Sequence, residues 1–71
     1  NEREIRYLQV KSAYEWAVNS VFEKQKERFN KTIELCNYYL VKFPSGKVSQ
    51  EVKQIKNQAN IKFNNPIYDG Y

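Results

Sequence analysis

Few residues in this chain of 71 could perform catalysis. Histidine is absent, which excludes the Ser–His and Cys–His pairs that activate nucleophiles. With one cysteine, Cys36, and no histidine, neither a disulfide framework nor a zinc site is expected. Carboxylate pairs such as Glu23 and Glu27 fall on a mixed-charge helix, whereas acid–base catalysis needs a cleft that shifts their pKa. We therefore expect no enzyme, no catalytic residue, no cofactor and no metal.

The aromatic residues favour binding instead. The chain has one Trp, six Tyr and four Phe, and protein interfaces are enriched in Tyr, Trp and Arg. Most of these aromatic residues fall at core spacings, as does Cys36, which we interpret as a small core hydrophobe. Our candidates for partner binding are residues outside these core positions: Leu35, Tyr38, Lys31, Lys42 and Trp16.

Prolines and glycines divide the chain into three uninterrupted segments. They occur at Pro44, Gly46, Pro66 and Gly70, and no strand-like alternation persists between them. The sequence therefore predicts an all-α fold with helices at about 2–19, 23–43 and 47–64, and a short C-terminal tail at 66–71. Ser45 or Gly46 is the expected cap of the third helix, and Phe43-Pro44 ends the second.

Each predicted helix has an apolar stripe at helical spacing. In the second helix it comprises Phe29, Ile33, Cys36, Leu40 and Phe43, widened by Thr32 and Tyr39; Leu35 and Tyr38 fall outside it. In the third helix it comprises Val48, Val52, Ile55, Ala59 and Phe63, opposite a polar face of Lys47, Gln50, Lys53, Gln54, Asn57 and Gln58.

The first helix differs because it is apolar on two sides. One stripe comprises Tyr7, Val10, Tyr14, Ala17 and Val21, and the other comprises Ile5, Leu8 and Trp16. We expect the second stripe to be partly exposed in a monomer, or covered by another element or another copy. One finished end and one open end are typical of a helical repeat array.

The formal charge of +4 is modest, and the ion pairs expected at helical spacing are Glu2/Arg6 and Glu27/Lys31. Only the stretch 47–62 is plainly basic. An alternative reading is therefore a small basic helical nucleic-acid-binding domain that uses Lys47, Lys53, Lys56 and Lys62, although we expect no nucleic acid.

The order of residue types in the second helix resembles helix A of a TPR-like repeat and its turn. The residues are Phe29-x-x-Thr32-Ile33-x-x-Cys36-x-x-Tyr39-Leu40-x-x-Phe43-Pro44-Ser45, followed by Gly46-Lys47-Val48 and Val52 as the start of helix B. With the junction at 17–29, this resembles the last repeat of the BamD (YfiO) outer-membrane assembly lipoprotein family, Bacteroidetes type. Thr32 and Val52 stand where that family usually has alanine, and Cys36 where an aromatic residue is common.

The resemblance implies a protein-interaction scaffold at the periplasmic face of the bacterial outer membrane. Residues 1–65 would be the C-terminal TPR-like part of a longer protein, attached to the membrane only through a lipidated N-terminus outside this sequence. Its partner would be the periplasmic domains of the barrel-forming subunit, BamA. Periplasmic adaptors of the Tol-Pal-associated coordinator type share the aromatic-proline turn and remain an alternative, and the uncovered side of the first helix could also support self-association.

Overall fold

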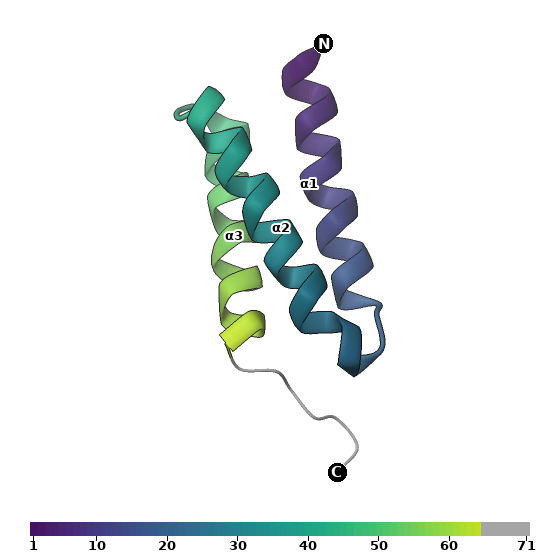
Figure 1. Ribbon diagram of the computed structural model, residues 1–71. Helices are drawn as coiled ribbons and strands as arrows, with labels where there is room; N and C mark the ends of the chain where they lie inside the picture. The colour runs from purple at the N-terminus through teal and green to yellow at the C-terminus, as the bar shows by residue number, and fades with distance from the viewer. Residues whose placement is uncertain (65–71) are drawn as a thin grey trace.

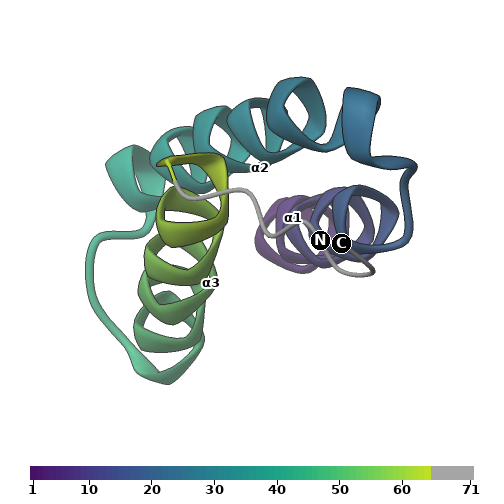
Figure 2. The same ribbon diagram turned by 90° about the horizontal axis from the view of Figure 1, so that it is seen from below.

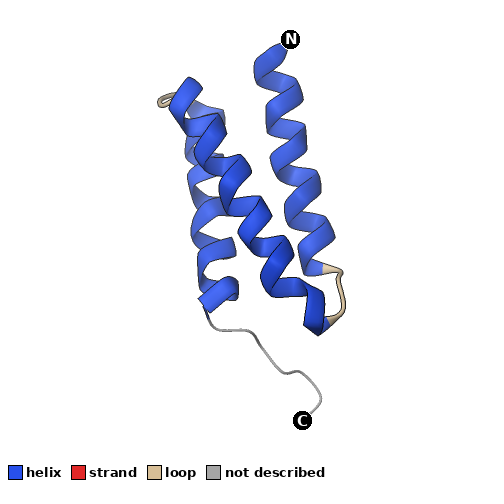
Figure 3. Cartoon of the chain, in the orientation of Figure 1, coloured by secondary structure: helices blue, strands red, loops and turns tan. Residues whose placement is uncertain are grey.

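Residues 1–64 form three α-helices and contain no β-strand, as a computed structural model of the chain describes them. The helices are α1 (Glu2–Val18), α2 (Phe22–Lys42) and α3 (Lys47–Asn64). They run alternately up and down (Figures 1 and 3). The all-α prediction is confirmed, with each predicted helix end within one residue of the observed end. Residue 65 and the predicted tail at 66–71 lie outside the described residues.

The ends of the helices follow from local chemistry. The side chain of Asn1 caps α1 by accepting a hydrogen bond from the Glu4 N–H (2.8 Å). Phe43, which precedes Pro44, leaves the helical region at φ −131° and ψ 74° and ends α2. Gly46, rather than Ser45, occupies the capping position of α3: its φ is 120°, and its carbonyl accepts from the Gln50 N–H (3.1 Å).

The core lies where α2 crosses both of its neighbours. Figure 2 shows α2 on one side of both α1 and α3, and α2 packs extensively against each, whereas α1 and α3 touch little. The buried side chains form two clusters, each drawn from all three helices. One contains Val10, Cys36, Tyr39 and Val52, and the other contains Ala17, Phe29 and Ala59.

The predicted stripe of α2 is confirmed, including its extension to Thr32 and Tyr39, which are fully buried. Two residues were assigned wrongly to the apolar stripes of the first and third helices. Val21 is exposed because it lies in the loop before α2 rather than on α1. Val48 is also exposed, and Ser49 turns inward in its place because its hydroxyl hydrogen-bonds the carbonyls of Phe43 and Ser45.

The expected exposure of the second stripe of α1 is confirmed for the single chain. Ile5, Leu8 and Trp16 are 57%, 53% and 53% exposed, because they lie opposite the side of α1 that packs against α2. The polar face predicted for α3 is exposed at all six positions. Glu2 and Arg6 form the expected ion pair, whereas the expected pair of Glu27 and Lys31 is not formed within the described structure.

Truncation of Val52 should test this core. Val52 is fully buried and Val41 is 82% exposed. A Val→Ala substitution at each position therefore separates the effect of burial on stability from the effect of helix propensity. We expect Val52→Ala to lower the free energy of unfolding by about 2 kcal/mol, because two methyl groups leave the core. Val41→Ala should be neutral or slightly stabilising. Urea denaturation followed by circular dichroism measures both, and equal effects would contradict the assigned core.

Candidate protein-interaction surface

The candidate binding residues gather where α1 and α2 lie side by side. On α2, Lys31, Leu35, Tyr38 and Lys42 recur every three or four residues and therefore share one side of the helix. Three side-chain contacts join this side of α2 to α1. We call this surface the α1–α2 face, and it comprises Glu2, Ile5, Arg6, Trp16, Arg28, Lys31, Leu35, Tyr38 and Lys42.

At the end nearest the N-terminus, the α1–α2 face carries a charged cluster around Tyr38. The Glu2 carboxylate accepts hydrogen bonds from Lys42 Nζ (2.7 Å) and Arg6 Nε (2.9 Å). These bonds, that of Lys42 first, hold the pKa of Glu2 below its usual value. The Arg6 guanidinium lies over the Tyr38 ring, 4.3 Å from its centroid. Exposed ion pairs add little stability, so their main effect here is to hold Tyr38 in position.

At the other end of the face, Trp16 stacks against Arg28. The guanidinium carbon lies 3.9 Å from the indole ring, within the range of a cation–π contact. Arg28 Nη1 also donates to the Ser20 hydroxyl (2.6 Å), which in turn donates to the Trp16 carbonyl. This network holds the indole in place while about half of its surface stays exposed. Arg28 Nε is buried and finds no acceptor among residues 1–64.

The five candidates differ in how free they are to bind. Trp16 and Tyr38 are exposed and lie at opposite ends of the face, and Lys31 is exposed between them on α2. Leu35 falls outside the predicted stripe of α2, yet it is partly buried against the cluster of Val10 and Cys36. The reason is its position on the α1 side of α2. Lys42 is exposed, although its charge is already paired with Glu2.

Sequence reasoning missed several residues that shape the α1–α2 face. Arg6 and Arg28 belong to it only because they cross to an aromatic ring on the other helix, which no local pattern reveals. Beside the face, a shallow depression of about 530 Å³ includes Val41, which is almost fully exposed. Its described lining consists of Glu34, Asn37, Tyr38, Val41 and Lys42.

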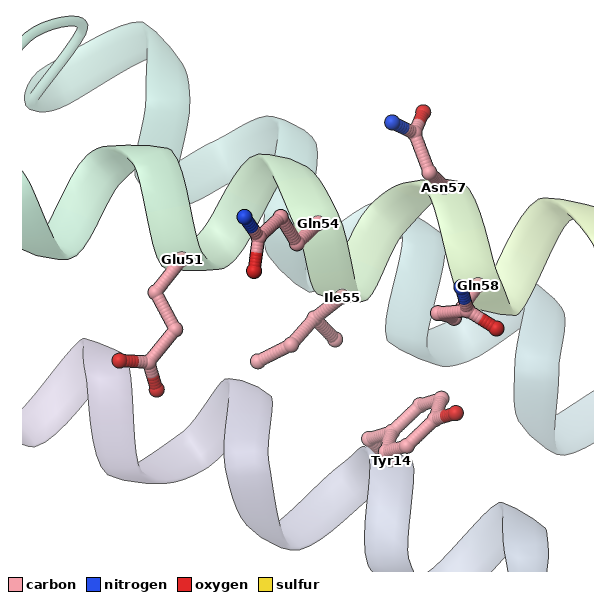
Figure 4. Close-up of a pocket in the computed structure, with 6 residues that line it drawn as sticks. All are labelled: Tyr14, Glu51, Gln54, Ile55, Asn57 and Gln58. Carbon is pink, nitrogen blue, oxygen red and sulfur yellow. The ribbon is translucent and has the colours of Figure 1, made fainter.

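A second groove, of about 330 Å³, runs between α1 and α3 (Figure 4). Tyr14 and Ile55 face each other across it, and Asn57 points away. Glu51 points toward α1, where its carboxylate accepts a hydrogen bond from the Tyr7 hydroxyl and raises the pKa of that phenol. The groove is lined by amides, one carboxylate, one phenol and the aliphatic Ile55, a set that suits hydrogen bonding rather than nucleophilic chemistry.

The four lysines of the nucleic-acid alternative are spread around α3. Lys47, Lys53, Lys56 and Lys62 are separated by six, three and six residues, so at 3.6 residues per turn they do not share one face. Lys47 and Lys53 are exposed, whereas Lys56 and Lys62 are partly buried. The arrangement therefore offers no basic stripe along the helix.

Cys36 behaves as a core residue. It is fully buried among Val10, Tyr39 and Val52, and burial raises the pKa of its thiol from 9.0 to about 11. The thiolate is the nucleophilic form of cysteine, so both burial and the raised pKa disfavour reactivity.

Within residues 1–64 there is also no cluster of three potential metal ligands, and no helix is long and apolar enough to cross a membrane.

The raised pKa of Cys36 predicts a loss of stability in alkaline solution. The unfolded thiol ionises at its ordinary pKa of 9.0 while the folded thiol keeps its proton until about 11. The contribution of this group is therefore complete below the lower value and is lost as pH rises through the higher one. We expect the stability difference between the wild type and Cys36→Ala to shrink across this window in urea titrations. A constant difference would contradict the assignment.

Comparison with known proteins gave no match to this chain among family models, curated proteins or solved structures.

Proposed function

We propose that this chain is a protein-interaction module and that its α1–α2 face is the docking surface. The observation that carries the proposal is the exposure of Trp16, Tyr38 and Ile5 on a single face, whereas Phe29 and Tyr39 are almost completely buried. Trp and Tyr dominate the energetics of protein interfaces, and Arg residues already stack on both rings of this face. Preformed helices with ordered side chains lose little conformational entropy on binding.

The rim of the α1–α2 face supports the same proposal. Glu2, Arg6 and Lys42 lie beside Tyr38, and Lys31 is exposed between Tyr38 and Trp16 on α2, so charges of both signs border the apolar anchors. Such a border favours one orientation of the partner and excludes mismatched ones. The face therefore suits a partner with an apolar ridge flanked by charges of complementary sign.

The proposed family is TPR-like, of the BamD outer-membrane assembly type. Three antiparallel helices, with the turn Phe43-Pro44-Ser45 between the last two, support a repeat hairpin preceded by one further helix. The proposed partner is then the periplasmic region of a BamA-like barrel-forming subunit, at the outer membrane. This assignment depends on the sequence resemblance, which covers about residues 10–63, whereas the docking role depends on the exposed face.

Calorimetric titration of the chain into the periplasmic domains of a Bacteroidetes BamA-like subunit tests both parts. We expect saturable binding that weakens about tenfold or more in Tyr38→Ala and Trp16→Ala, as expected for interface hot spots. Leu35 is unsuitable for such a test because its substitution would also disturb the core.

A matched pair of isoleucines provides the control. Ile5 lies on the α1–α2 face and is 57% exposed, while Ile61 lies on α3 and is 54% exposed. Ile5→Ala should weaken binding, whereas Ile61→Ala should leave it unchanged. Equal losses from both would contradict the α1–α2 face as the docking surface. A folded chain that does not bind would contradict the BamA-like partner.

A further inference from the structure

The charges of the α1–α2 face are mostly positive. Its charged members are four basic residues and one carboxylate: Arg6, Arg28, Lys31, Lys42 and Glu2. Glu2 already accepts hydrogen bonds from Lys42 Nζ and Arg6 Nε, so two cations share its negative charge. Arg28 and Lys31 form no ion pair within residues 1–64. The face therefore carries positive charge that the described part of the chain does not neutralise.

Most of this positive charge follows one side of α2. The basic residues that we call the basic row share the side of α2 that lies toward α1, together with Leu35 and Tyr38, because all six positions are three or four residues apart. The basic row comprises Lys24, Arg28, Lys31 and Lys42. The other basic residue of α2, Lys26, lies over the Phe63 ring of α3 instead.

The acidic residues of α2 keep to a separate side of the helix. Glu23, Glu27 and Glu34 are separated by four and seven residues, so they share one side, and all three are exposed. Glu27 directly precedes Arg28 and therefore lies about 100° from it around the helix. The charges of α2 are thus sorted by sign, with the positive ones toward α1.

The exposed aromatic residues lie at two separate points along the basic row. Trp16 stacks against Arg28, and Tyr38 lies on the same side of α2 as Lys42. Arg28 and Tyr38 are ten positions apart, so these two points lie roughly 15 Å apart along α2. Lys31 is exposed between them. Apolar anchors and positive charge therefore alternate along one strip of surface.

We propose, on the basis of the docking role inferred above, that the partner of the α1–α2 face is an acidic amphipathic helix. Its apolar side contacts Ile5, Trp16 and Tyr38, and its carboxylates pair with Lys24, Arg28 and Lys31. A helix in a groove is a common mode of recognition, and complementary charge fixes its orientation. A helix that reaches both aromatic residues needs apolar side chains about eleven positions apart, since that spacing returns to nearly the same side.

The backbone of this face favours a helix over an extended segment. The face is built from α1 and α2 alone, and the interior main-chain groups of a helix bond within that helix. There is no β-strand within residues 1–64 whose edge could pair with an added strand. An approaching helix satisfies its own main-chain groups, so it needs only side-chain contacts.

The side chains of this face favour a protein partner over a nucleic acid. Single-stranded nucleic acids also combine positive charge with exposed aromatic residues, but their bases bind by stacking on open rings. Here Arg6 and Arg28 already lie over the rings of Tyr38 and Trp16. Ile5 is 57% exposed and offers an aliphatic contact that suits an apolar side chain better than a base.

Three synthetic peptides test the proposal by fluorescence anisotropy with the 71-residue chain. Each is an amphipathic helix with leucine at i, i+4, i+7 and i+11, and the flanking positions are all Glu, all Gln or all Lys, which are similar helix formers. We expect saturable binding of the Glu peptide, roughly tenfold weaker binding of the Gln peptide and none of the Lys peptide.

The outcomes separate this inference from the docking role. Equal binding of the Glu and Gln peptides would overturn the acidic partner, whereas a loss of both in Tyr38→Ala would still support the face as a docking surface. Failure of the Glu peptide to bind would also overturn the inference. The docking role itself is tested by the titration with the BamA-like domains described above.

Variants of the basic row locate the contact. Lys24→Gln and Lys31→Gln should each weaken the Glu peptide several-fold and leave the Gln peptide unchanged, because each removes one charge-assisted contact. Lys53→Gln removes the same charge from an exposed position of α3 and should change neither. An equal effect of Lys53→Gln would reveal attraction to the overall charge of the chain and would overturn the proposal.

A single-stranded oligothymidylate tests the other class of partner. It carries negative charge but presents bases in place of apolar side chains. We expect it to bind more weakly than the Glu peptide at the same salt concentration. Tighter binding that is lost in Trp16→Ala would overturn the acidic helix as the partner of this face.

Discussion

Phe29, Cys36 and Tyr39 are buried between α1 and α3, and this burial of one side of α2 is the constraint on which the rest of the structure depends. Since α1 and α3 touch little, each is held in place mainly by α2. Cys36 and Tyr39 pack with Val10 and Val52, while Phe29 packs with the small residues Ala17 and Ala59. A void on this side of α2 would therefore loosen both neighbouring helices, because apolar interiors tolerate little change in volume.

The same arrangement leaves the α1–α2 face uncovered. Once α2 has packed its inner side on both neighbours, the side of α1 that carries Ile5 and Trp16 stays about half exposed, and Arg28 is the side chain that lies against Trp16 there. Arg6 and Arg28 lie against the exposed rings of Tyr38 and Trp16, so these aromatic residues are held in defined orientations. An exposed aromatic residue that is already ordered is a better anchor for a partner than a mobile one.

Much of the fold could be predicted from the sequence, because the stripe of α2 and the breakers Pro44 and Gly46 act locally. The exposure of Ile5, Leu8 and Trp16 was also predictable from their place opposite the main stripe of α1. Errors arose where a specific side-chain contact, rather than the helical spacing of apolar residues, decides which residue is buried. Ser49 replaces Val48 in the core because its hydroxyl bonds the preceding loop, and Leu35 is partly buried because α1 covers its side of α2. The contacts of Arg6 and Arg28 depend on the packing of different helices, so no local pattern indicates them.

Trp16 is the single tryptophan of the chain, and its fluorescence is the most direct test of the central claim that the α1–α2 face is open. The measurement is acrylamide quenching of Trp16 emission at concentrations where sedimentation shows a monomer. The account predicts red-shifted emission that acrylamide quenches readily in the folded monomer, because about half of the indole surface is exposed. Blue-shifted emission that is protected from acrylamide in the monomer would show that the chain covers this face itself, and would contradict the account.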